Sequence, residues 1–216
     1  MAAKKRPAPW LKPLAHAVLA LPLLWLLYNW GRIVLLHDFE ALSADPVQYT
    51  IRFSGDYALR SLIAALAVSP LAKLTGWKPL IRIRRLTGLW AFTYVLIHLL
   101  CYFGMDRLFS FAMLWEDVAK RIFITIGMTA FVLLIPLAAT STNGMIKRLG
   151  AKNWQRLHKL VYIIGPLGVW HYFMMIRGHQ YLPWYHAGVL AFLLGYRLFD
   201  YARFRFRRSR LQRAAE

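Results

Sequence analysis

The 216-residue sequence has a single cysteine and few charged side chains. That cysteine, Cys101, excludes an intrachain disulfide and any metal site built from several cysteines. Charged residues make up 17% of the chain, whereas a typical soluble domain has about 25%. Hydrophobic residues make up 59% and occur in long blocks, so the sequence is typical of a protein whose solvent is lipid.

Nucleotide-binding motifs are also lacking. The chain has no GxGxxG or P-loop pattern, so we expect no dinucleotide or nucleotide domain of its own. The net charge of +19 would indicate nucleic-acid binding in a soluble protein. Here the basic residues cluster between apolar blocks, as the positive-inside rule predicts, so we expect contact with membrane lipid and no nucleic-acid partner.

Six apolar blocks predict an all-α integral membrane protein with a single domain over residues 1–216. Each block is close to the ~20 residues that cross a hydrocarbon core, and the backbone must be helical there to satisfy its own hydrogen bonds. The expected helices are residues 10–36, 57–74, 86–104, 122–140, 160–176 and 184–201. No small-residue cleavage site clearly follows the first block, so we expect it to be retained. Asp-Pro and Ser-Gly turn signals mark residues 37–56 as an outer loop, with room for one short helix.

The basic residues predict the orientation of this six-helix bundle. Residues 4–12, 73–85, 147–159 and 203–213 hold 20 of the 28 lysines and arginines, and all four segments lie on one side of the expected helices. The positive-inside rule places that side in the cytoplasm. Both termini are then cytoplasmic, which requires an even number of spans.

Two histidines lie deep inside expected helices. His98 is twelve residues past the start of the block 86–104, and His171 is eleven past the start of the block 160–176. Both helices run outward, so at 1.5 Å per residue the two side chains lie about 18 and 16 Å from the cytoplasmic ends. An ionisable residue at such a depth is a functional candidate.

Two imidazoles at matched depth can clamp one haem iron from both faces. Such an iron favours electron transfer over oxygen chemistry, because no coordination position stays open. The alternative is that each histidine is structural and bonds to a neighbouring carbonyl or hydroxyl group. For two matched histidines we favour haem.

Other residues are candidates for binding a cofactor. His158, at the cytoplasmic start of the fifth helix, is a candidate for a further haem ligand by its depth, with only His16 available as its partner. The alternative is an interfacial residue near basic neighbours. Arg84 and Arg85 can pair with haem propionates or a flavin phosphate, although topology alone accounts for them. Arg60, near the outer end of the expected second helix, either reaches the outer surface or meets a propionate.

Three long stretches resemble a known family. They are residues 45–77, 84–102 and 137–178, and they contain the motifs RRLTGLWAF and TSTNGMIKRLGAKNWQRLHKLVY. They are similar to the MsrQ family, the haem-binding membrane subunits of bacterial periplasmic methionine sulfoxide reductase systems. Its wider relatives are the ferric-reductase-like transmembrane domains.

The resemblance implies an inner-membrane electron-transfer subunit rather than the catalytic subunit of the complex. It implies b-type haem, FMN, electrons from the quinone pool or a flavin reductase, and a periplasmic molybdenum-containing partner, MsrP, that reduces methionine sulfoxide in envelope proteins. It places the family's haem-ligand positions at His98, His158 and His171. Two alternatives stay open: a ferric or other metal reductase acting alone, and a transporter or scaffold with structural histidines.

Overall fold

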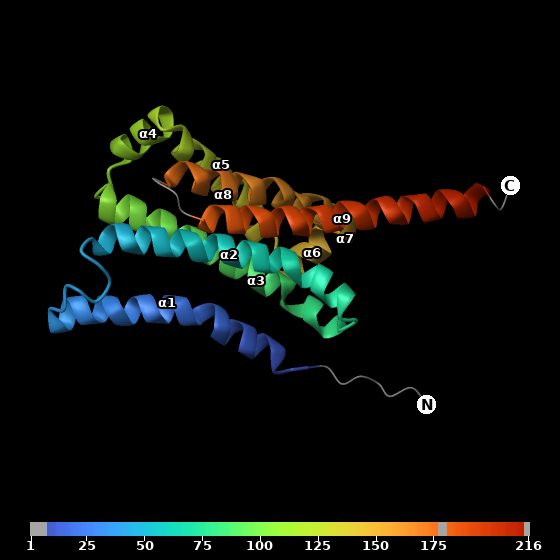
Figure 1. Ribbon diagram of the computed structural model, residues 1–216, viewed down its shortest axis with the longest axis horizontal. Coiled ribbons are helices and arrows are strands. Elements are labelled where there is room, and N and C mark those ends of the chain that lie inside the picture. The colour runs from blue at the N-terminus through green and yellow to red at the C-terminus, as the bar shows by residue number, and fades with distance from the viewer. Residues whose placement is uncertain (1–7, 177–180, 214–216) are drawn as a thin grey trace.

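The computed structural model describes residues 8–176 and 181–213, and every regular element in these ranges is helical (Figure 1). In chain order the elements are α1 (Leu11–Leu36), α2 (Pro46–Leu74), η1 (Lys78–Ile83), α3 (Arg84–Cys101), the π-helical turn η2 (Tyr102–Asp106), α4 (Phe111–Lys120), α5 (Ile122–Ala139), α6 (Asn143–Leu149), α7 (Ala151–Leu157), η3 (His158–Leu160), α8 (Val161–Met175) and α9 (Leu182–Arg213). The expected all-α fold is confirmed.

Four helical segments in the described ranges are long and apolar enough to cross a membrane. They are Leu11–Leu36, Pro46–Leu74, Lys78–Asp106 and Ile122–Ala139, and each contains most or all of one of the first four expected spans. The fifth, α8, has 15 residues and is about 22 Å long, shorter than a hydrocarbon core of about 30 Å. The chain is therefore a membrane protein with several candidate transmembrane helices.

The second helix begins much earlier than expected. Asp45 caps α2 by accepting a hydrogen bond from the backbone N–H of Gln48 at 2.9 Å, and Pro46 follows at the first helical position. Proline is favoured there because its missing N–H would have no partner anyway. The Asp-Pro pair thus starts a helix, and the expectation of a loop is wrong for residues 46–56.

Short helices outside the expected spans were not predicted. Ser110 caps α4 through the N–H of Met113, and Thr142 caps α6 through the N–H of Met145. These two helices have 10 and 7 residues, too short for a hydropathy pattern to reveal. The last helix also continues past the expected end at residue 201 to Arg213, so the basic tail is helical.

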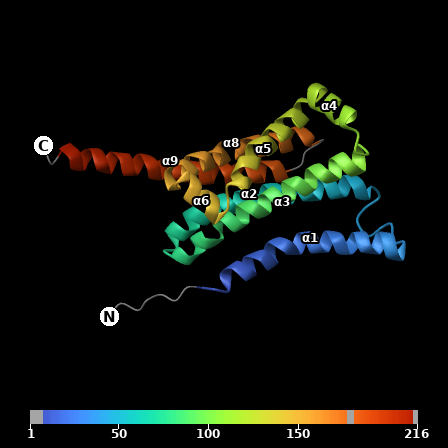
Figure 2. The same cartoon turned by 180° about the vertical axis from the view of Figure 1, so that it is seen from behind.

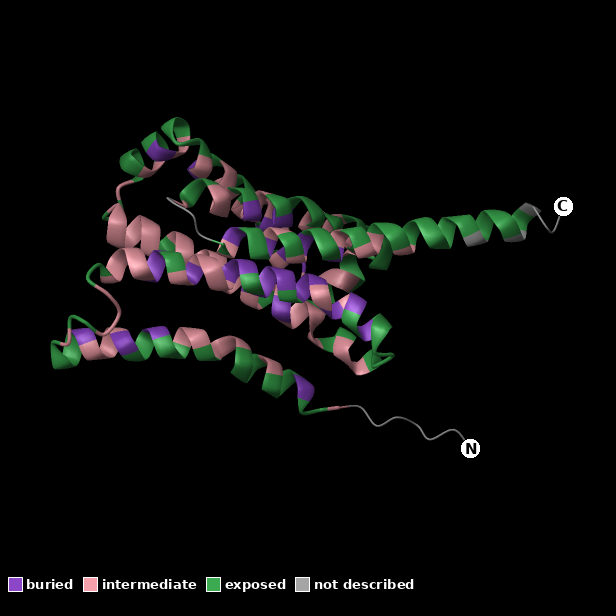
Figure 3. Ribbon diagram, in the orientation of Figure 1, coloured by how far each residue is buried: buried purple, intermediate pink, exposed green. Residues whose placement is uncertain are grey.

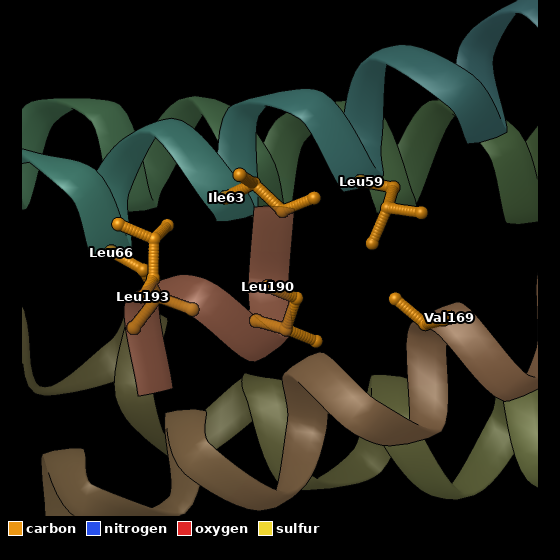
Figure 4. Packing of buried hydrophobic residues seen from close by; sticks show 6 residues of the cluster. All are labelled: Leu59, Ile63, Leu66, Val169, Leu190 and Leu193. Carbon is orange, nitrogen blue, oxygen red and sulfur yellow. The ribbon is translucent and has the colours of Figure 1, made fainter. Parts of the chain in front are cut away.

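Helix α2 is the centre of the bundle. Leu59, Ile63 and Leu66 of α2 pack against Val169 of α8 and against two leucines of α9, Leu190 and Leu193 (Figure 4). A second buried cluster joins Leu62 of α2 to α3, α5 and α8. Buried residues accordingly concentrate on α2, while the far part of α9 extends from the bundle and is exposed (Figure 3).

Helix α1 contacts the rest of the bundle through long side chains. The indole N–H of Trp30 donates to the Thr50 hydroxyl at 2.9 Å, and the Tyr94 hydroxyl donates to the carbonyl of Leu19 at 2.7 Å. The beginning of α1 and the end of α9 lie on the same side of the bundle, and α4 lies on the opposite side (Figures 1 and 2).

A buried carboxylate fixes α4 to the end of the third helix. Asp117 accepts hydrogen bonds from the Tyr102 hydroxyl, from Arg107 at 2.7 Å and from Arg121 at 2.9 Å. These contacts connect η2, α4 and the start of α5, so the whole segment is held by one side chain.

Replacing Asp117 with alanine tests this role. Breaking a buried ion pair costs about 3–5 kcal/mol. Because Arg121 is half exposed and water screens its charge, we expect the free energy of unfolding in detergent to fall by about 2 kcal/mol. Hydrogen exchange should accelerate across residues 107–121. Glu116→Ala, which breaks an exposed ion pair with Lys120 on the same helix, is the control and should leave both readouts unchanged.

Candidate functional site

The structure brings His98 of α3 and His171 of α8 together. Their ring centres lie 6.2 Å apart with the ring planes at 82° to one another. The two residues are 73 positions apart in the sequence, and the depth calculation alone placed them at one level. The expectation of a shared depth is confirmed.

Main-chain carbonyls hold both rings in one tautomer. Nδ1 of His98 lies 2.8 Å from the carbonyl oxygen of Ile51, and Nδ1 of His171 lies 2.7 Å from that of Phe123. A carbonyl can only accept, so each Nδ1 carries the proton and donates it. Each Nε2 therefore keeps its lone pair, which is the form of imidazole that binds a metal.

Two glycines make room for the rings. A Cβ atom built on Gly55 of α2 would lie 2.9 Å from Nδ1 of His98, and one on Gly127 of α5 would lie 2.9 Å from Nδ1 of His171. Each glycine comes four residues after the carbonyl that its histidine contacts, so the carbonyl and the gap belong to one helix turn. The pairs α2–α3 and α5–α8 thus repeat one arrangement, in which one helix supplies a carbonyl and a glycine and the other supplies the histidine. We call each of these arrangements a histidine seat.

The geometry of the seats fits a metal bound between the rings. Bonds from the metal to imidazole nitrogen of about 2.0 Å place the ring centres about 6 Å apart, which matches the observed separation. The described residues contain no group of three or more histidine, cysteine, aspartate or glutamate side chains that could hold a metal ion alone. Two axial imidazoles therefore suit a metal whose remaining ligands come from a macrocycle.

His158 lies apart from this pair, in a pocket near the cytoplasmic ends expected for α3 and α8. Its Nδ1 bonds to the carbonyl of Trp154 at 3.0 Å, its ring stacks on the Trp154 indole, and Nε2 lies 3.4 Å from the Ser141 hydroxyl. The same pocket is lined by Arg84 and Arg85. Burial, together with these two cations, lowers the pKa of His158, so its ring is neutral at neutral pH.

His16 is not the partner of His158 in this structure. Its Nδ1 accepts a hydrogen bond from the indole N–H of Trp90 at 3.1 Å, and its side chain is exposed. In the part of the chain that the structure describes, no second imidazole lines the His158 pocket. Besides His158, its polar lining consists of Ser141, Arg84, Arg85 and the Trp154 indole, and the rest is apolar.

Arg60 does not stand near a helix end. Because α2 begins at Pro46, Arg60 lies about halfway along the helix, and its guanidinium pairs with Asp56 one turn earlier. The guanidinium also covers the ring of Tyr57 at 4.9 Å. The expected position at the outer end of the helix is wrong, because the helix start had been placed eleven residues too late.

Two ionisable residues of this region were missed from sequence. His186 was not among the candidates predicted from the sequence, yet it is buried in α9 and lies against Asp56. Asp56 was assigned to a loop. The cap at Asp45 was the signal that would have placed Asp56 inside a helix, where a carboxylate needs a partner.

The fold defines an all-helical membrane protein in which the imidazoles of His98 and His171 lie close together between the helices. The family model described as ferric reductase like transmembrane component matches residues 54–169, which include α3, α5 and most of α8. The chain belongs to this family of transmembrane proteins.

Curated relatives place it more narrowly. A protein of Caulobacter vibrioides is 41% identical over 91% of this chain and 92% of its own length. Proteins of Herminiimonas arsenicoxydans and Polaromonas naphthalenivorans are 46% and 44% identical over 80% and 89% of this chain, and 80% and 86% of their own lengths. All three are named protein-methionine-sulfoxide reductase heme-binding subunit MsrQ, and this chain is a member of the same MsrQ group. No solved structure matches the chain.

The histidine seats predict opposite effects for two glycine substitutions. Gly127→Ala forces the His171 ring to shift, and overpacking of this kind costs about 1–3 kcal/mol. Gly195→Ala in α9 meets nothing within 4 Å, so it should gain up to about 1 kcal/mol of helix propensity. Thermal unfolding in detergent measures both. Equal changes of the unfolding temperature in the same direction for the two variants would contradict the close approach at Gly127.

Proposed function

We propose that this chain is an inner-membrane electron-transfer subunit that binds b-type haem between His98 and His171. The observation that carries the proposal is the pair of facing rings, each with its Nδ1 proton on a carbonyl and its Nε2 lone pair free. The names of the MsrQ relatives, which describe heme-binding subunits, support it. A purely structural role for two histidines does not require their rings to face each other in one tautomer.

The bound haem would supply one-electron chemistry, and the chain's residues determine which kind. His98 and His171 would both bind its iron, and this would leave no open position for oxygen or a substrate. The carbonyls of Ile51 and Phe123 accept hydrogen bonds from the rings, and this makes the imidazoles more basic ligands. Such a site passes electrons onward, and the chain acts as an electron carrier within an oxidoreductase complex.

We further propose six membrane spans with both termini in the cytoplasm. The position of the beginning of α1 and the end of α9 on one side of the bundle supports an even number of crossings. The basic residues of η1, α6 and α7 lie in connections on that same side, in keeping with the positive-inside rule. In this arrangement α8 and the first part of α9 are the fifth and sixth spans.

The pocket around His158 is proposed as a second cofactor site. Its neutral imidazole can bind a second haem iron, and Arg84 and Arg85 can pair with propionates or with the phosphate of FMN. A Cβ at Gly88 beside these arginines meets nothing within 4 Å, so the pocket has open space. The protein would then carry one haem or two, or one haem and FMN.

Electrons would enter from quinol or a flavin reductase and leave to a periplasmic MsrP-type molybdenum reductase that repairs methionine sulfoxide. The methionine sulfoxide reductase named for the relatives supports this acceptor. A stand-alone ferric or metal reductase and a non-redox transporter or scaffold are the competing functions. One experiment separates our proposal from the stand-alone metal reductase: purified protein is reduced with quinol and then given either MsrP or a ferric chelate. Rapid reoxidation of the protein by MsrP supports our proposal, and reoxidation by the chelate alone contradicts it.

The haem ligands are tested by three alanine variants. His98→Ala and His171→Ala should each abolish the same low-spin bis-histidine signal in the reduced-minus-oxidised spectrum, because both rings bind one iron. His37→Ala, at the exposed residue that ends α1, is the matched control and should keep the full signal.

The assignment is wrong if either of the first two variants retains that signal at full strength. His158→Ala should leave it in place and alter only the cofactor of the second pocket. Haem and flavin stoichiometry on each purified variant shows which cofactor that is.

A further inference from the structure

Asp56 of α2 and His186 of α9 form a buried pair that the electron-transfer role does not use. Nε2 of His186 lies 3.7 Å from Oδ1 of Asp56. His186 is 2% exposed. Neither of these two atoms has a hydrogen-bond partner among the residues that the structure describes. Unpaired buried polar atoms are rare in folded proteins, so a pair of them facing one another calls for an explanation.

The hydrogen bonds around the pair leave a place for one proton. Nδ1 of His186 lies 2.8 Å from the carbonyl of Leu182, so Nδ1 carries a proton, and in the neutral form of the ring Nε2 then carries a lone pair. That lone pair faces a carboxylate oxygen, and two acceptors with no hydrogen between them repel each other. One added proton turns this contact into an attractive one.

The charges around the pair decide what the added proton does to the site. The other oxygen of Asp56 pairs with Arg60, so carboxylate and guanidinium together are neutral. The ring of Tyr172 in α8 meets the His186 ring edge-on, with 5.6 Å between the ring centres. The ring centre of Tyr185 in α9 lies 5.5 Å from that of His186. Both side chains are phenols without a formal charge. The cluster therefore changes from neutral to +1 when it takes up a proton.

The pair lies beside the two histidine seats. Asp56 follows Gly55, whose surface contacts the His98 ring. Tyr172, which contacts His186, follows His171. In a low-dielectric interior, a change of charge at this position acts strongly on a charge that arrives between His98 and His171.

We propose that Asp56 and His186 form a redox-linked proton-binding site, an inference that rests on the proposed haem between His98 and His171. When a donor such as quinol or dithionite places one electron on the iron, one proton binds between Nε2 of His186 and Oδ1 of Asp56. When the electron leaves, the proton is released to water. The electron adds one negative charge and the proton one positive charge, so the membrane interior keeps its net charge.

The midpoint potential of the haem, titrated optically at a series of pH values, tests the proposal. In the wild-type protein, each tenfold change in proton concentration should shift the reduction equilibrium by up to tenfold, or about 59 mV for one electron. Asp56→Asn and His186→Gln each replace one of the two proton-binding groups with an amide of similar volume, which does not take up a proton. Each variant should lose most of this slope while keeping the low-spin haem spectrum.

Asp200→Asn is the matched control. Asp200 lies on the same helix as His186, fourteen residues further along, and pairs with Lys73. It should keep the wild-type slope. A wild-type potential that is independent of pH, or either variant with haem intact and the slope unchanged, would overturn the proton-binding site and leave the haem assignment standing. A wild-type protein without haem would overturn both proposals, and the spectrum reveals this before any titration.

Discussion

The hydrogen bond from each paired histidine to a main-chain carbonyl of the neighbouring helix is the constraint on which the rest of the site depends. It fixes the proton on Nδ1, leaves Nε2 of His98 and His171 as the metal-binding nitrogen, and sets each ring against a glycine one helix turn away. A helix backbone in lipid cannot move its carbonyls freely, because they also belong to the helix ladder. The ligand geometry is therefore built into the backbone of α2 and α5.

Helix α2 connects this site to the stability of the fold. The same helix supplies the carbonyl of Ile51, the gap at Gly55 and the carboxylate of Asp56, and one turn further on its leucines enter both buried clusters. Apolar packing thus positions the polar groups, which gain little stability by themselves in a membrane. Because α2–α3 and α5–α8 repeat one arrangement, the site is symmetric around the space between the two rings.

Hydropathy and helix rise were sufficient to predict the helical fold, the first four spans and the shared depth of His98 and His171. These features depend only on the position of a residue along its own helix. The contact of Asp56 with His186 could not be predicted in this way, because it depends on how two helices far apart in the sequence turn toward each other. The late start assigned to α2 added to this, since it left Asp56 and the turn before it in a loop. Short helices such as α4 and α6 were missed because their caps, rather than any hydrophobic pattern, define them.

The central claim is that two imidazoles of this chain bind a single iron. Electron paramagnetic resonance of the oxidised protein, combined with exposure of the reduced protein to carbon monoxide, tests it most directly. The account predicts a low-spin ferric signal and a reduced spectrum that carbon monoxide leaves unchanged, because both axial positions are occupied. A high-spin signal with rapid carbon monoxide binding at the site of His98 and His171 would contradict it.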